Sequence, residues 1–252
     1  KQTQALFPPL AEGYGGILIS GGARVDGRNL RKALVEAAQR MGMDHLKGHA
    51  DLLWHKEGVS GVKVNGKSYE ADQVVLCAGA WLNPLLAPMG LDSQVSPQKG
   101  QIVEVELPRT DTGAWPVLMP PDNQYILPFD GGRIVLGSTH ESEAGFDDRV
   151  TAGGVHLILK KALACAPGLA QASLIEMRAG IRPKTPRFLP VFGPVKGFQG
   201  LWLANGLGST GITIGPYLGR ELAKQILGQP TELDPHLYTV DQIIKHHDQG
   251  RG

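Results

Sequence analysis

A glycine-rich turn is the feature of this sequence whose residue spacing most directly suggests chemistry. Residues 206–211 read Gly-Leu-Gly-Ser-Thr-Gly, between a short apolar segment at residues 201–204 and an amphipathic segment that starts near Pro216. Where a strand, a glycine-rich turn and a helix follow one another, backbone N–H groups and the positive end of the helix dipole can bind an anion. The pattern therefore predicts a candidate binding turn.

Three interpretations of this turn remain open from the residues alone. The spacing G-x-G-x-x-G is that of dinucleotide-binding turns, which are followed about 20 residues later by a strand ending in Asp or Glu. Residues 228–232, Gly-Gln-Pro-Thr-Glu, do not form such a strand. The glycines could instead serve a tight turn and close packing. In the third interpretation, the helix N-terminus stabilises the negative charge of another bound group, such as the pyrimidine edge of a reduced flavin.

Three further side chains could act on a small substrate. Arg182 precedes a proline in an apolar stretch, and its guanidinium stays charged and matches a carboxylate with two parallel hydrogen bonds. Tyr125, in a predicted strand, could add a phenolic hydrogen bond, and His140 could face the same substrate. The alternatives are a structural ion-pair arginine, a packed tyrosine and a solvated histidine. No group of residues has metal-ligand spacing, and no G-x-S-x-G elbow is present.

The elements that must position these residues follow two patterns. Short apolar strands that alternate with helices are typical of a parallel sheet; they are predicted at residues 15–19, 73–78 and 201–204, with helices from Asp26 to Gly42 and from Pro216 to Leu227. Strands separated by turns rich in Pro, Gly and Asp indicate an antiparallel sheet; they are predicted at residues 101–106, 124–127, 133–137 and 174–180, with a helix over 156–166. Asn65-Gly66 predicts a hairpin between residues 59–64 and 67–70. We therefore expect a mixed α/β (α+β) fold in which an antiparallel domain interrupts a parallel one.

Composition limits the classes of function. The chain has 252 residues and a formal net charge of +1, which argues against a nucleic-acid partner because such proteins need a basic face. The most apolar stretch, residues 74–91, is interrupted by Gly, Asn and Pro, so we expect no membrane span. Two cysteines in apolar surroundings, Cys77 and Cys165, predict neither a disulfide framework nor a zinc site and favour a reducing cytoplasm.

Five segments, in order, resemble the FAD-dependent D-amino-acid oxidase superfamily in its glycine oxidase and sarcosine oxidase branch. They are 25–30, which resembles V-D-x-x-x-L; 71–81, which is similar to A-D-x-V-V-x-A-x-G-x-W; 97–101, which resembles P-x-x-G-Q; 180–186, which resembles G-x-R-P-x-T-P; and 205–216, which resembles the C-terminal flavin loop. The resemblance covers nearly the whole chain. It implies the remainder of an FAD-binding Rossmann-like domain at 23–94 and 186–228, an antiparallel-sheet substrate domain at 5–22 and 95–185, and a peripheral tail at 229–252. Because no G-x-G-x-x-G precedes Gly13, we expect the chain to be the C-terminal two-thirds of such a protein.

The resemblance also implies roles for individual residues. FAD would be non-covalent, since neither cysteine is at the position of the covalent attachment in sarcosine oxidases, and it would be held by Ala78, Gly79, Trp81, Leu207, Gly208, Ser209, Thr210, Gly211 and Ile212. Arg182, with Tyr125 and His140, would hold a small carboxylate-bearing substrate for hydride transfer to the flavin. Ser209 stands where glycine oxidase carries a second arginine. The expected activity is oxidation of a small amino acid or N-substituted amino acid.

Other functions stay open at this point. A flavin-dependent 2-hydroxy-acid dehydrogenase would also present a carboxylate to Arg182, and an inactive carboxylate-binding fragment would need no cofactor. The sequence leaves undecided the substrate side chain, the electron acceptor, the oligomeric state and whether this chain alone binds FAD.

Overall fold

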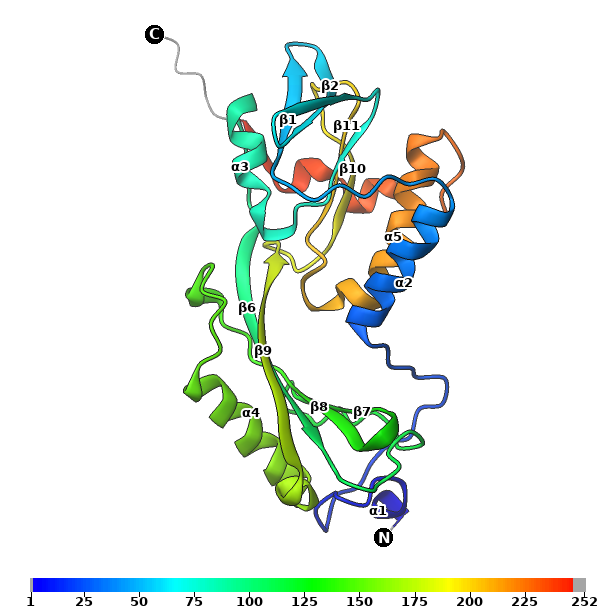
Figure 1. Ribbon diagram of the computed structural model, residues 1–252, viewed down its shortest axis with the longest axis vertical. Helices are drawn as coiled ribbons and strands as arrows, with labels where there is room; N and C mark the ends of the chain where they lie inside the picture. Colours follow the sequence, from blue (N-terminus) through cyan, green and yellow to red (C-terminus); the bar gives the residue numbers. More distant parts are fainter. Residues whose placement is uncertain (1, 247–252) are drawn as a thin grey trace. The chain divides into compact units, whose positions relative to one another are not determined.

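The computed structural model describes residues 2–246, and the chain divides into two compact units (Figure 1). The first unit comprises residues 1–25 and 98–181, and the second comprises residues 26–97 and 182–252. The assignment of a flavin-binding or substrate-binding role to either unit remains a prediction. The mixed α/β architecture agrees with the fold class expected from the sequence.

The first unit is built on a four-stranded sheet with the order β7-β8-β6-β9. Its strands are β6 (Ser96–Glu106), β7 (Tyr125–Pro128), β8 (Arg133–Gly137) and β9 (Ser173–Lys184). β8 pairs antiparallel with both β6 and β7, which confirms the predicted antiparallel pattern. Helix α4 (Ala152–Cys165) shares the buried core of this unit with the strands, and the short helix α1 (Gln2–Leu6) lies near the N-terminus.

The second unit contains the parallel strand pair expected after the alternating segments. β11 (Leu201–Asn205) pairs parallel with β4 (Val74–Leu76) and antiparallel with β10 (Val191–Pro194). Helices α2 (Gly27–Arg40) and α5 (Gly211–Ile226) belong to the same unit and meet where each begins. The side chain of Ile212 lies 2.8 Å from where a Cβ would stand at Gly27, so only glycine fits at the start of α2 without movement of Ile212.

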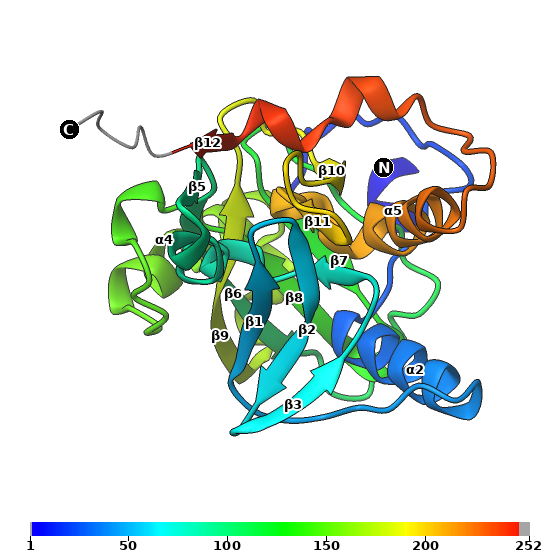
Figure 2. The same ribbon diagram turned by 90° about the horizontal axis from the view of Figure 1, so that it is seen from above.

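A second, three-stranded sheet of this unit carries the predicted hairpin. Figure 2 shows β1 (Ala50–His55), β2 (Gly58–Val64) and β3 (Lys67–Glu70) side by side, and all neighbours pair antiparallel. Asn65 and Gly66 join β2 to β3 with φ of 50° and 87°. Positive φ at both central residues is the requirement of a type I′ turn, so the hairpin prediction is confirmed.

The remaining elements complete the core of the second unit. Helix α3 (Asn83–Leu86) leads to β5 (Leu91–Ser93), which pairs with β12 (Ile244–His246). Short 3₁₀ helices are η1 (Gly79–Trp81), η2 (Ala87–Met89), η3 (Asp130–Gly132), η4 (Ser142–Ala144), η5 (Pro167–Gln171), η6 (Gly208–Thr210), η7 (Pro235–Tyr238) and η8 (Val240–Gln242). Val240 and Ile243 are each 2% exposed and belong to the core with Leu201 and Leu203. The described part of the 229–252 segment is therefore integral to the unit and not peripheral.

Three local expectations from the sequence are wrong. Residues 15–19 form no strand, and Ile17 is 92% exposed; an isolated apolar run gains no ladder hydrogen bonds without a neighbouring strand. β4 is not buried on both faces, because Val75 is 39% exposed. Helix α5 begins at Gly211, not near Pro216, which is an interior residue of the helix. The sequence does not indicate the first turn, because glycine has a low helix propensity.

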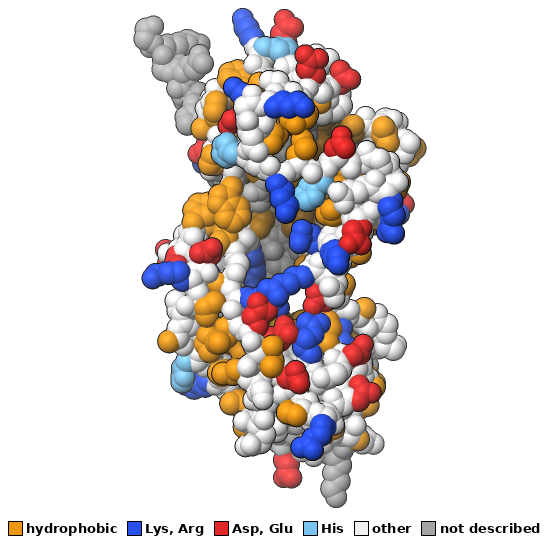
Figure 3. All heavy atoms as spheres, in the orientation of Figure 1, with side chains coloured by type: hydrophobic (Ala, Val, Ile, Leu, Met, Phe, Trp, Pro, Cys, Tyr) orange, Lys and Arg blue, Asp and Glu red, His pale blue; other side chains and the backbone are white. Residues whose placement is uncertain are grey.

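The surface carries charges of both signs, as the near-equal numbers of basic and acidic residues imply. Figure 3 shows acidic and basic side chains interspersed on the visible face. Within the described residues, no helix is long and apolar enough to cross a membrane.

Candidate functional site

Two turns meet at one edge of the parallel strand pair in the second unit. Because β4 and β11 run parallel, the chain leaves both strands at the same edge, where ligands bind in open α/β sheets. After β4 it passes through Ala78 into η1, and after β11 it passes through Gly206 into η6. Asn205 joins the turns: its Nδ2 donates to the Gly79 carbonyl at 2.8 Å, and its Oδ1 accepts from the Gly206 amide at 2.7 Å.

The glycines of these turns serve different purposes. Gly206 has φ of 76°, and a Cβ there would overlap the buried side chain of Thr185, so this glycine serves close packing. Gly79 and Gly208 have φ of 56° and 52° but border open space. No atom lies within 4 Å of a Cβ at Gly79, and only the Pro183 carbonyl oxygen, at 3.9 Å, lies near one at Gly208. These two positions leave room for a group to approach the backbone.

The N-terminus of α5 opens directly from this turn. The Thr210 side chain does not cap the helix, because its Oγ1 donates to the Leu207 carbonyl at 2.8 Å. The first amides of a helix have no intrahelical acceptor, so together with the helix dipole they favour negative charge here. Two large apolar side chains beside the turns are half exposed, Trp81 at 54% and Ile212 at 50%.

All nine residues predicted to bind the cofactor therefore belong to the second unit, in the segments that follow β4 and β11. They are Ala78, Gly79, Trp81, Leu207, Gly208, Ser209, Thr210, Gly211 and Ile212. Their role in binding stays a prediction. Sequence reasoning did not assign Asn205 a function; the only signal was an Asn-Gly pair directly after a short apolar strand.

Arg182 lies in the same unit, near the C-terminal end of β9, and is half buried. The next residue, Pro183, places its carbonyl oxygen 3.9 Å from the Cβ position of Gly208. Thr185 fixes the segment that follows, since its hydroxyl donates to the Leu189 carbonyl at 2.8 Å. The chain that carries Arg182 thus passes directly beside the glycine-rich turn.

Tyr125 and His140 belong to the first unit. Tyr125 is half buried on β7 opposite Gly137, where a Cβ would overlap the tyrosine ring. His140 is exposed, and the residues on either side of it hydrogen-bond through their backbones to β6. Since Arg182 is part of the other unit, a shared site for these three side chains stays a prediction.

A buried lysine beside His140 was not anticipated. Lys99 is 1% exposed, and its Nζ lies 3.8 Å from a carboxylate oxygen of Glu141 and 3.8 Å from one of Asp147. Glu141 also accepts from Gln101 Nε2 at 2.7 Å. Hydrogen bonds from Arg149 hold the pKa of Asp147 well below its usual range. The positive charges of Arg149 and Lys99 lower this pKa further. This network braces the segment that carries His140. The signal in the sequence was a lysine at the start of an apolar strand.

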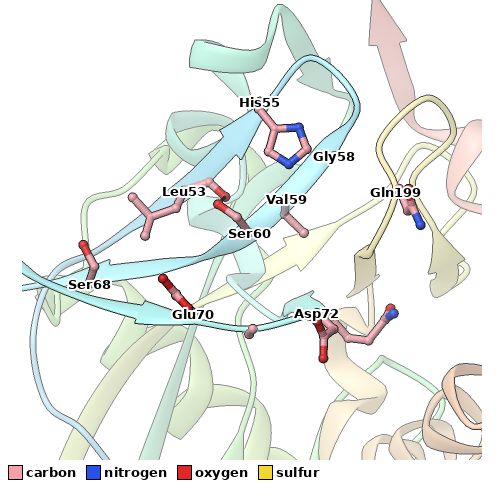
Figure 4. A pocket seen from close by; sticks show the side chains of 11 residues that line it. Leu53, His55, Gly58, Val59, Ser60, Ser68, Glu70, Asp72 and Gln199 are labelled. Atoms are coloured by element: carbon pink, nitrogen blue, oxygen red, sulfur yellow. Dashed lines mark hydrogen bonds between the residues drawn. The ribbon is translucent and has the colours of Figure 1, made fainter.

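A polar pocket of about 580 Å³ lies beside the three-stranded sheet (Figure 4). The residues that line it are Leu53, His55, Gly58, Val59, Ser60, Ser68, Glu70, Ala71, Asp72, Gln73 and Gln199. None of the predicted cofactor or substrate residues is among them. Within residues 2–246 no group of His, Cys, Asp and Glu side chains could hold a metal ion, so the pocket offers no metal centre.

Comparison with known proteins identifies the family to which these features belong. The model of the DAO family, described as FAD dependent oxidoreductase, matches residues 1–225. The chain belongs to this family. It is 56% identical over 235 residues to the oxidoreductase YurR of Bacillus subtilis, covering 93% of this chain and 63% of YurR. It is 32% identical over 242 residues to glycine oxidase of Pseudomonas aeruginosa, covering 94% of this chain and 65% of that enzyme.

A solved structure gives the same assignment. The structure of iminodiacetate oxidase from Chelativorans sp. BNC1 matches with a TM-score of 0.91 and 40% identity, over 94% of this chain and 64% of that one. The chain thus spans slightly less than two thirds of the length of these relatives.

The residues present fit the cofactor of the DAO family. Open space at Gly79 and Gly208, the uncapped N-terminus of α5 and the exposed Trp81 give backbone donors and an aromatic surface at one sheet edge. The flavin ring system is extended and partly anionic, so both the backbone N–H donors and the aromatic surface of Trp81 suit it.

Proposed function

We propose that this DAO-family protein is an FAD-dependent oxidoreductase of a small amino acid or N-substituted amino acid, and that Arg182 binds the substrate carboxylate. One observation carries the proposal: the segment that bears Arg182 passes within 3.9 Å of the Cβ position at Gly208 in the predicted flavin turn. The relatives named glycine oxidase and iminodiacetate oxidase support the substrate class, because both names describe small amino acids with a free carboxylate.

In this proposal the two turns hold the flavin. The Gly79 and Gly208 backbones allow close approach, and the amides at the start of α5 stabilise negative charge on the ring. FAD, when bound, supplies two-electron oxidation of the substrate carbon that bears the nitrogen. Asn205 keeps both turns at a fixed separation, so that the protein orients the reactants instead of reacting itself.

Arg182 orients the substrate. A guanidinium stays protonated at any working pH and binds a carboxylate through two parallel hydrogen bonds, which fixes both its position and its rotation. Tyr125 is proposed to donate a phenolic hydrogen bond to the same carboxylate, and His140 to face the substrate from the segment braced by Lys99. Substrates without a carboxylate would lose this anchor and react poorly.

The experiment is a flavin titration followed by substrate reduction without oxygen. The protein is titrated with FAD, and glycine, iminodiacetate, N-methyl amino acids and 2-hydroxy acids are then tested for loss of the oxidised-flavin absorbance. We expect FAD uptake and reduction by the amino acids. A protein that takes up no FAD, or whose flavin is reduced only by 2-hydroxy acids, contradicts the proposal.

Variants at Arg182 test the carboxylate anchor. Arg182→Met should raise the KM or the Kd of a carboxylate ligand by about 10- to 100-fold, since a charge-assisted pair of hydrogen bonds is lost. Arg182→Lys keeps the positive charge but loses the two parallel N–H donors, so its KM or Kd should lie between those of Arg182→Met and the wild type. Arg187→Met is the matched control, because Arg187 is exposed and five residues away. Equal affinities for the Arg182→Met and Arg187→Met variants would contradict a role for Arg182.

A further inference from the structure

We propose that Gly137 is a positioning residue, which fixes where the phenol hydroxyl of Tyr125 lies on the sheet of the first unit. Gly137 on strand β8 pairs with Tyr125 of β7 on one side and with Ile102 of β6 on the other. A Cβ built at Gly137 would stand 2.5 Å from Tyr125 Cζ, 2.5 Å from its hydroxyl oxygen and 2.8 Å from Cε2. The end of the ring that carries the hydroxyl therefore occupies the place that a side chain at residue 137 would need.

The ring lies on the face of the sheet that is turned away from helix α4. The next row of paired residues, Ile126, Leu136 and Val103, belongs to the core that the strands share with α4. Side chains alternate along a strand, so the row that contains Tyr125 and Gly137 points to the opposite face. Gly137 is buried although it has no side chain of its own, whereas Tyr125 is half buried. The tyrosine ring thus covers the strand and remains accessible itself.

The backbone at Gly137 is held from both sides, so it cannot move away from the ring. The buried Gln124 side chain donates from Nε2 to the Ser138 carbonyl at 3.0 Å, which ties this segment to β7. On the other side, the Gln101 amide of β6 donates to Thr139 Oγ1 at 2.8 Å. A tyrosine ring turns about two side-chain bonds, and extra atoms in a packed region displace side chains first. A methyl group at residue 137 should therefore displace the ring and leave the strand in place.

The position of the hydroxyl decides whether Tyr125 can bind the substrate carboxylate, and this part of the inference rests on the proposed function. A hydrogen bond weakens steeply when its length and angle depart from their preferred values. A displaced ring keeps its hydroxyl but loses the bond to a carboxylate that Arg182 holds in place. Gly137 would then determine substrate affinity without touching the substrate.

The position of the ring can be measured without cofactor or substrate. The chain contains five tyrosines. In the NMR spectrum of protein with isotope-labelled tyrosine rings, the signal of Tyr125 is the one that Tyr125→Phe removes. Gly137→Ala should shift this signal and leave those of the other tyrosines unchanged. A Tyr125 signal that does not move overturns the inference.

A double-mutant cycle tests the consequence for the substrate. Gly137→Ala and Tyr125→Ala should each raise the KM for the amino acid that reduces the flavin by about tenfold or more, since each loses the same hydrogen bond to a charged group. The affinity for FAD and kcat should change much less than KM. The double variant should have the KM of Tyr125→Ala alone, because no ring is left to displace.

The matched control is Gly153→Ala. No atom lies within 4 Å of a Cβ at Gly153, which belongs to helix α4 of the same unit, so both the Tyr125 signal and KM should stay unchanged. Far-UV circular dichroism checks that each variant keeps the fold. KM effects that multiply in the double variant overturn the inference. A protein whose flavin no amino acid reduces contradicts the proposed function instead, and the NMR result then decides whether Gly137 positions the ring.

Discussion

The bridge formed by Asn205 should be the most sensitive point of the candidate site. Asn205 is 2% exposed and makes two hydrogen bonds, to the Gly79 carbonyl at 2.8 Å and from the Gly206 amide at 2.7 Å. Asn205→Ala removes both partners at once. Leaving a buried polar group unsatisfied costs about 1–3 kcal/mol. Gly206 is buried and carries the full cost, whereas the half-buried carbonyl of Gly79 borders open space and can be hydrated.

These terms predict a loss of about 2–4 kcal/mol in the free energy of unfolding for Asn205→Ala. The assay is urea denaturation followed by circular dichroism, with the midpoint and slope compared between variants. Asn205→Asp keeps an acceptor for the Gly206 amide but places a buried carboxylate oxygen against the Gly79 carbonyl, so its loss of stability should be greatest where that carboxylate is ionised. In addition, the affinity for FAD should fall in Asn205→Ala, because the two turns are no longer held together.

The matched control is Asn29→Ala, an exposed asparagine on α2 in the same unit, for which a change within about 0.5 kcal/mol is expected. If Asn205→Ala changes stability and FAD affinity no more than Asn29→Ala does, the bridge does not organise the turns and the reasoning is refuted.

Three other perturbations follow from buried or strained groups. Gly66→Ala should lower stability by about 1–2 kcal/mol in urea denaturation, because φ is 87° and a Cβ there meets open space, so the cost is conformational alone. Lys99→Met should cost about 1–3 kcal/mol by the same assay, since two partly exposed carboxylates lose their buried ammonium. Burial alone would raise the pKa of Glu221, but backbone amides and the Lys224 ammonium lower it to about 2 from 4.5. The stabilisation from Glu221 is therefore complete above about pH 4.5 and lost as the pH falls toward 2, so Glu221→Gln should weaken the acid dependence of unfolding; an unchanged profile would contradict this.

Features with a local physical cause could be predicted from the sequence. The hairpin at Asn65-Gly66 and the start of α2 at Asp26, whose carboxylate accepts from the Asn29 amide at 3.0 Å, depend on neighbouring residues alone. The glycine-rich turn was recognisable because helix, strand and glycines are consecutive. The sequence could not show that Gly206 serves close packing whereas Gly208 borders open space, because the packing of Thr185 on Gly206 joins residues from different segments.

Features that depend on distant contacts were missed or wrong. The Asn205 bridge spans 126 residues, and the two partners of Lys99, Glu141 and Asp147, lie 42 and 48 residues along the chain, so no spacing rule reveals them. The apolar run at 15–19 satisfies a strand pattern, but a strand also requires a neighbour. Likewise, the tail after Gln229 is polar on average, yet Val240 and Ile243 reach the core.

The central claim is that the turns after β4 and β11 hold FAD beside an arginine that binds a small amino acid. Its most direct test is the absorbance spectrum of the FAD-loaded protein after mixing with glycine or iminodiacetate in the absence of oxygen. We expect loss of the oxidised-flavin absorbance in the wild type, and a much higher substrate concentration for the same loss in Arg182→Met. A bound flavin that no carboxylate-bearing amine reduces, or one that is reduced equally well in Arg182→Met, would contradict it.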